Sequence, residues 1–162
     1  MAIRYLKVLL VLCTALMCLL YALQNLANLQ VAHQVVGLVL NMADHQYYPN
    51  SILPAITSPI LTGLAVTVII ALEFAAGLIA LKGCLNLWRH RHASSEAFQQ
   101  AKCWALLGCG LAVLIWFGLF GVIGGALFQM WQTELGSQSL NGAFQYAVSA
   151  SLILIFVNMP DH

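Results

Sequence analysis

Glu73 is the residue whose type and position most suggest chemistry in this sequence. It is the one acidic or basic residue set deep in a long apolar segment, residues 59–82. At about 1.5 Å of rise per residue it lies roughly 13 Å from Lys82, near the middle of a hydrocarbon layer about 30 Å thick. A carboxyl group at that depth is costly unless it is paired. It therefore indicates an ion or proton site, a contact with a partner subunit, or a hydrogen bond that locks helix packing.

The residues around Glu73 indicate which way it faces. Steps of three or four along a helix place Glu73 on the same face as three small residues, Ala76, Gly77 and Ala80. Small residues let a second helix approach closely. We therefore expect Glu73 to face protein rather than lipid.

Few other groups in the sequence suggest chemistry. Trp116 lies at mid-depth in a third apolar segment, where its indole NH can donate to a group on another helix. His33, Asp44 and His45 share one connection, but their spacing matches no common metal-ligand pattern. No predicted span contains a histidine that would hold a haem, and no phosphate-loop, dinucleotide or G-x-S-x-G motif is present. We expect no metal, no cofactor and no enzymatic activity.

Composition sets the class of protein. Of the 162 residues, 62% are hydrophobic and 7% are charged, which is far from a soluble domain. Four spans of about 20 to 25 residues use up the chain. The formal net charge of +1 gives no basic surface for nucleic acid. The sequence predicts an all-α polytopic membrane protein, a single domain built as a bundle of four transmembrane helices.

The bounds follow from the apolar runs. We predict spans at residues 5–26, 59–82, 101–128 and 142–157, with an outer loop at 27–58 and a cytoplasmic loop at 83–100. The first half of the outer loop has apolar residues at helical spacing, which predicts an amphipathic helix lying on the membrane surface. In the cytoplasmic loop, Ser94 or Ser95 can cap a helix with Glu96 in its first turn.

Glycines recur on one face of the third span. Gly121 and Gly125 form a G-x-x-x-G pair, a pattern that permits close helix crossing. We expect the whole glycine face to pack against protein, and its principal members are Gly110, Gly118, Gly121 and Gly125.

The basic residues predict the orientation. All six lysines and arginines fall at the amino terminus or in and beside the middle connection, at positions 4, 7, 82, 89, 91 and 102. By the positive-inside rule, both termini and the middle loop are cytoplasmic. The cysteines lie within spans or near their cytoplasmic ends, so we expect no disulfide in the outer loops.

Several motifs occur together in order along the chain. They are residues 55–59 (AITSP), Glu73, residues 121–125 (GVIGG), residues 130–132 (MWQ) and residues 159–161 (MPD). In these the chain resembles a family of small predicted bacterial integral membrane proteins of unknown function. The family has an aromatic residue before the membrane glutamate, where this chain has Leu72. The resemblance implies four helices with cytoplasmic termini, and it implies no activity, substrate or cofactor.

Two functions remain open from the sequence. The first is a non-catalytic subunit or scaffold of a complex in the bacterial inner membrane, in which small-residue faces dock on other helices and Glu73 makes a buried polar contact. The second is a pore or transporter made by self-association, with Glu73 in the pathway. The expected partners are membrane lipids and either other membrane subunits or further copies of the chain.

Overall fold

The computed structural model of the chain describes residues 1–161. It is all-helical in this range, and four of its helical segments are long and apolar enough to cross a membrane. The predicted class, an all-α protein with four spans, is confirmed. The elements are α1 Ala2–Ala27, α2 Leu29–Leu40, α3 Pro59–His90, α4 Ser95–Ala101, α5 Cys103–Val113, η1 Leu114–Leu127, η2 Met130–Gln132 and α6 Glu134–Asn158.

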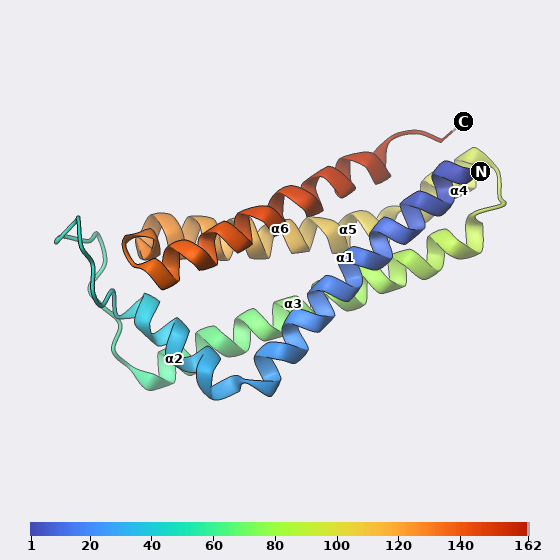
Figure 1. The fold of residues 1–162 in the computed structure, drawn as a ribbon. Coiled ribbons are helices and arrows are strands. Elements are labelled where there is room, and N and C mark those ends of the chain that lie inside the picture. Colours follow the sequence, from blue (N-terminus) through green and yellow to red (C-terminus); the bar gives the residue numbers. More distant parts are fainter. Residues whose placement is uncertain (162) are drawn as a thin grey trace.

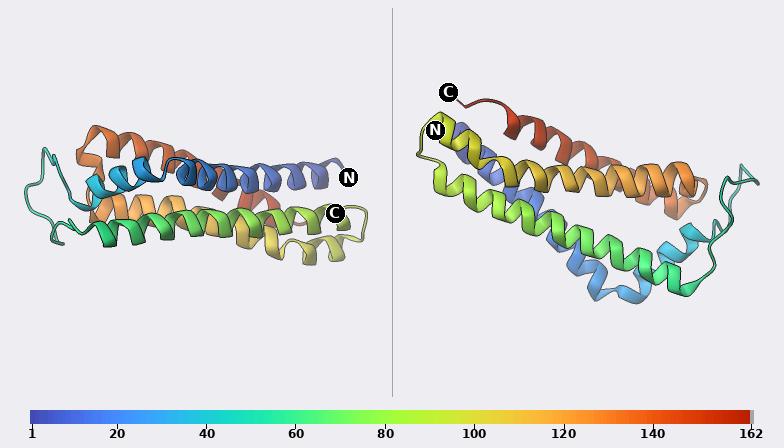
Figure 2. Two further views of the ribbon diagram at one scale, coloured as in Figure 1. Left: turned by 90° about the horizontal axis from the view of Figure 1, so that it is seen from below. Right: turned by 180° about the vertical axis from the view of Figure 1, so that it is seen from behind.

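The four spans run up and down in chain order. Both termini and α4 lie at one end of the bundle, and α2 with the loop that follows it lies at the other (Figure 1). We call these the terminal end and the loop end. Helix α3 packs along α1 and α5, and α6 packs along α5 and η1. Toward the loop end the α1–α3 pair diverges from η1 and α6, which is visible in Figure 1 and, from behind, in the right-hand view of Figure 2.

The second span is longer than the sequence indicated. Helix α3 does not end at Lys82 but continues to His90, so the predicted loop 83–100 shrinks to residues 91–94. The continuation is held by packing, because Gly83 lies against the backbone of Ala105 and Leu87 is fully buried. At 32 residues, α3 is roughly 48 Å long and exceeds the hydrocarbon thickness.

The fourth span also differs from its predicted bounds. Helix α6 begins at Glu134 rather than at residue 142. Thr133 caps it by accepting a hydrogen bond from the Gly136 amide at 3.1 Å, and Glu134 occupies the first turn, where an acid favours the helix dipole. The earlier start puts Gln138 and Ser139 on a helix that faces the other spans.

Two local predictions have clear outcomes. Ser94 caps α4, with its hydroxyl oxygen accepting from the Ala97 amide at 3.3 Å. The predicted amphipathic helix of the outer loop is α2, which packs against α3 and places Gly37 beside Thr62. Its position on the membrane surface stays a prediction.

Close contact between α3 and α5 rests on glycine. A Cβ added at Gly108 would overlap the backbone of Ala80, whereas one added at Gly110 would have no neighbour within 4 Å. The core between these helices is correspondingly built from small residues, including Ala80, Ala105 and Cys109.

This difference gives a matched test. Gly108→Ala should destabilise the bundle by about 1 to 3 kcal/mol through overpacking. Gly110→Ala should be neutral or slightly stabilising, because alanine favours helix more than glycine does. Both can be measured by unfolding in mixed detergent micelles followed by circular dichroism, and equal midpoints for the two variants would refute the close α3–α5 contact.

Candidate functional site

Glu73 lies at the centre of the molecule and is 1% exposed. Its Oε2 accepts a hydrogen bond from Asn25 Nδ2 at 3.0 Å, which connects α3 to α1. Within residues 1–161, Oε1 has no hydrogen-bond partner. The acid is thus partly satisfied inside the chain, and one of its oxygens is left free to bind another group.

Three aromatic side chains pack together near Glu73. Tyr21 of α1, Trp116 of η1 and Tyr146 of α6 have ring centroids 4.9 to 6.2 Å apart. The hydroxyls of the two tyrosines are hydrogen-bonded to each other, which joins α1 to α6. Trp116 is 3% exposed. The expected indole hydrogen bond to another helix stays a prediction, and the Trp116 ring packs against Tyr21 and Tyr146.

A cavity of roughly 560 Å³ occupies the space where the helix pairs diverge. Glu73, the three aromatic rings and Asn25 line it together with side chains of α2 and α6. Its remaining lining is mostly apolar on the α2 and α3 side and more polar on the α6 side, where Gln138 and Ser139 lie. Among its lining residues Glu73 is the one acidic group, and none is Lys, Arg or His.

Four of the residues expected to pack helices are buried in the single chain. Ala76, Gly77 and Ala80 are buried, with Gly77 against Leu19 and Ala15 of α1. Gly125 is buried beside Leu140 of α6.

The glycines of the third span are only partly packed within the single chain, because Gly125 contacts α6 and three others are open. A Cβ at Gly110 or Gly118 would meet nothing within 4 Å, and one at Gly121 would meet atoms of its own helix alone. Gly110 lies on α5, whereas Gly118, Gly121 and Gly125 lie on η1, whose backbone hydrogen bonds reach five residues back rather than four, as in the bond from the Phe128 amide to the Ile123 carbonyl. The helix therefore turns less per residue, and α-helical spacing misplaces the later glycines.

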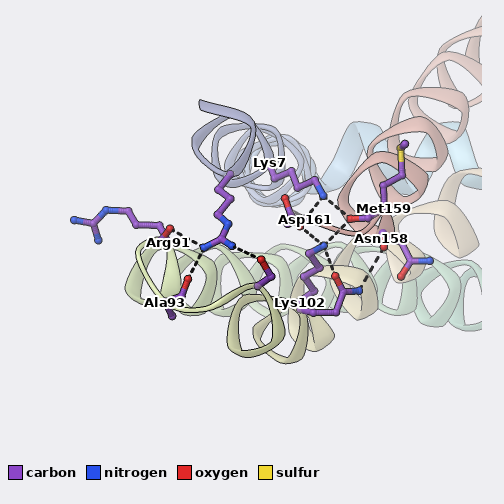
Figure 3. A network of polar contacts seen from close by, with 10 residues as sticks. Lys7, Arg91, Ala93, Lys102, Asn158, Met159 and Asp161 are labelled. Carbon is purple, nitrogen blue, oxygen red and sulfur yellow. Dashed lines mark hydrogen bonds and ion pairs between the residues drawn. The ribbon is translucent and has the colours of Figure 1, made fainter. Parts of the chain in front are cut away.

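A second polar cluster lies at the terminal end (Figure 3). It holds the carboxyl-terminal tail, residues 159–161, against the helices. The Asp161 carboxylate pairs with Lys7 at 2.9 Å and Lys102 at 2.5 Å, and all three side chains are at most 3% exposed. Both ammonium groups also donate to the Met159 carbonyl oxygen, at 2.6 and 2.8 Å. The cluster ties the tail to α1 and to the start of α5.

Arg4 makes a related set of bonds beside this cluster. Its guanidinium donates to the carbonyl oxygens of Arg91 and Ala93, at 3.2 and 2.6 Å, and to Ser95 Oγ at 3.2 Å. It also lies 4.8 Å from the ring centroid of the buried Phe98. Arg4, Lys7 and Lys102 are thus structural groups as well as topology signals, which sequence reasoning missed.

Titration of Asp161 should control how firmly the tail is held. Burial by itself raises the pKa of Asp161, but hydrogen bonds from Lys102 and Lys7 outweigh it, so the pKa lies below the usual 3.8. A lowered folded-state pKa means that the stabilisation is complete well above pH 3.8 and is lost as the pH falls through the lowered value.

We therefore expect the stability difference between the wild type and Asp161→Asn to be constant at neutral pH and to shrink below pH 3.8. The comparison needs unfolding curves at several pH values. A difference that persisted unchanged at the lowest pH would contradict the ion pairing.

At the loop end, Gln132 organises the connection between α2 and α3. It is 2% exposed, and its Oε1 accepts from the amides of Tyr47 and Tyr48 at 2.9 and 2.7 Å. Trp131 stacks on Tyr47, with ring centroids 6.1 Å apart. The motif at residues 130–132 therefore holds the outer loop, a role that its sequence alone did not indicate.

Metal ligands are not gathered in the described part of the chain. Within residues 1–161 no group of three or more His, Cys, Asp or Glu side chains is close enough to hold a metal ion. The five cysteines are free.

Four apolar spans around a buried acid define a polytopic integral membrane protein. Residues 3–160 match the model of the family described as "Predicted small integral membrane protein (DUF2165)", and the chain belongs to this family. No functionally curated protein and no solved structure matches the chain. The family description carries no activity, so function has to be argued from the structure.

Proposed function

We propose that the chain is a small non-catalytic subunit or scaffold of a membrane complex. The observation that carries the proposal is the set of glycines left open on the third span. Gly110, Gly118 and Gly121 are half-buried, and within residues 1–161 no other segment fills the space beside them. Glycines on a lipid-facing helix let another helix approach closely, so this face fits a helix from another subunit.

In this proposal Glu73 is a structural group that stabilises the bundle. Its bond to Asn25 fixes α1 against α3, and a fixed bundle can present the same outer face to a partner. Leu114 and Phe117, 64% and 60% exposed, lie on the helix that carries the open glycines and provide apolar contact area. The binding free energy would come from van der Waals packing of the close helices.

Photo-crosslinking tests the docking face. Benzoylphenylalanine in place of Phe117, which lies beside Gly121, should capture a specific membrane protein in native membranes. The same group in place of Phe144 of α6, which is 68% exposed against 60% for Phe117, should not capture that protein. Gly118→Ile should abolish the specific product, and a product that survives this change would contradict docking at the glycine face.

A homo-oligomeric pore or transporter is the second candidate. It is favoured by the cavity beside Glu73, which provides space next to the buried acid within one chain. In this reading ion or proton flux depends on Glu73, and assembly joins several copies of the chain.

For location we propose the bacterial inner membrane with both termini in the cytoplasm. The elements that carry the six lysines and arginines meet at the terminal end, which supports this orientation (Figure 1).

The orientation predicts a labelling pattern in a chain freed of its native cysteines. Single cysteines at Gln46 and at Gln138, both exposed, should react with an impermeant thiol reagent added outside. A cysteine at the exposed Ser95 should not react until the membrane is permeabilised. The reverse pattern would overturn the orientation.

A further inference from the structure

The cavity beside Glu73 has the dimensions and lining of a ligand site. Its volume of roughly 560 Å³ lies within the range of about 300 to 1,000 Å³ that is typical of small-molecule sites. It is lined by α1, α2, α3, η1 and α6 and is partly open at the side, so a bound molecule would contact five elements of the chain and remain accessible from outside. This inference does not depend on the proposed subunit role.

The charge of the lining indicates the sign of the ligand. Glu73 is the one acidic residue that lines the cavity, and no basic residue lines it. Asn25 satisfies Oε2, while Oε1 has no partner among residues 1–161. An ionised carboxyl group in such a setting gains most from a positively charged ligand.

The aromatic rings indicate the same sign. Tyr21, Trp116 and Tyr146 line the cavity next to one another, and the faces of such rings attract cations, most of all quaternary ammonium groups that are weakly hydrated. The valines and isoleucines of α2 and α3 that complete the lining favour an apolar body.

We propose that this cavity binds a hydrophobic organic cation, with the positive centre beside Glu73 and the aromatic rings and the apolar body against α2 and α3. A small inorganic cation would leave the apolar lining unused. A neutral lipid chain would leave the Glu73 carboxyl group without a positive charge to pair with.

Equilibrium binding of tetraphenylphosphonium to the purified full chain in a neutral detergent tests the proposal. We expect saturable binding of one cation per chain. Glu73→Gln should weaken it by about tenfold or more, because the ion pair is lost while the shape is kept. Glu96→Gln, which removes an exposed acid outside the cavity, is the control and should bind like the wild type.

A second variant keeps the proposal testable if Glu73→Gln fails to fold. Val35→Phe fills the cavity from α2 and leaves Glu73 in place, so it should also weaken binding. Triphenylphosphine oxide, a neutral molecule of similar apolar character, should bind the wild type no more tightly than it binds Glu73→Gln.

Three results would overturn the proposal. They are absence of saturable cation binding to the wild type, equal affinity of the wild type and Glu73→Gln for the cation, and a neutral probe that binds as tightly as the cation. The last result would assign the cavity to a neutral amphiphile instead.

Discussion

Asp161→Asn should lower the free energy of unfolding by about 3 to 5 kcal/mol, the largest effect expected for a single substitution in this chain. The change keeps the size of the side chain but removes the charge that lies between the ammonium groups of Lys7 and Lys102. These groups would then face each other in a site where both side chains are at most 1% exposed. Unfolding in mixed micelles of sodium dodecyl sulfate, followed by circular dichroism, measures the loss.

Asp44→Asn provides the matched control for this measurement. Asp44 is an exposed acid of the outer loop, so its neutralisation should change the stability by less than about 0.5 kcal/mol. Adding Lys102→Met to Asp161→Asn should restore part of the loss by removing one of the unpaired charges. Equal stability of the two asparagine variants would show that the ion pairs do not hold the tail.

Glu73→Leu should cost about 1 to 3 kcal/mol, because it leaves the Asn25 amide group without its acceptor. Glu73→Gln should cost less, since its amide oxygen can accept the same hydrogen bond in nearly the same shape. Assembly should survive in the glutamine variant, and the same unfolding measurement separates the two substitutions.

The glutamine variant also discriminates between the two candidate functions. If Glu73 is a packing contact, any ion or proton flux attributed to the chain should be independent of the change. Loss of such a flux with the assembly intact on native gels would favour the pore. Equal stability of the Glu73→Leu variant and the wild type would show that the Glu73–Asn25 hydrogen bond does not stabilise the fold.

The four spans could be predicted because long apolar runs and the lengths between them are properties of the sequence alone. The burial of Glu73 could be predicted too, since Ala76, Gly77 and Ala80 share its helical face. Its hydrogen-bond partner, Asn25, could not be predicted. Asn25 reaches Glu73 through the lengthwise alignment of α1 and α3, which no spacing within one segment reveals.

Other features were missed for similar reasons. The continuation of α3 to His90 depends on contacts of Gly83 and Leu87 with other helices, and its polar residues at 89–91 resemble a loop. The altered turn of η1 shifted the later glycines of the third span, and an apolar, glycine-rich run gives no sign of that change. Asp161 pairs with Lys7, which lies 154 positions earlier in the sequence, so its role appears only once the chain is folded.

Native mass measurement after release from the membrane in a mild detergent tests whether the open glycine face makes this chain a subunit of a larger assembly. We expect a complex that contains a different membrane protein and that Gly118→Ile dissociates into single chains. A closed assembly of identical chains would favour the pore, and a single chain in both the wild type and the variant would contradict the claim.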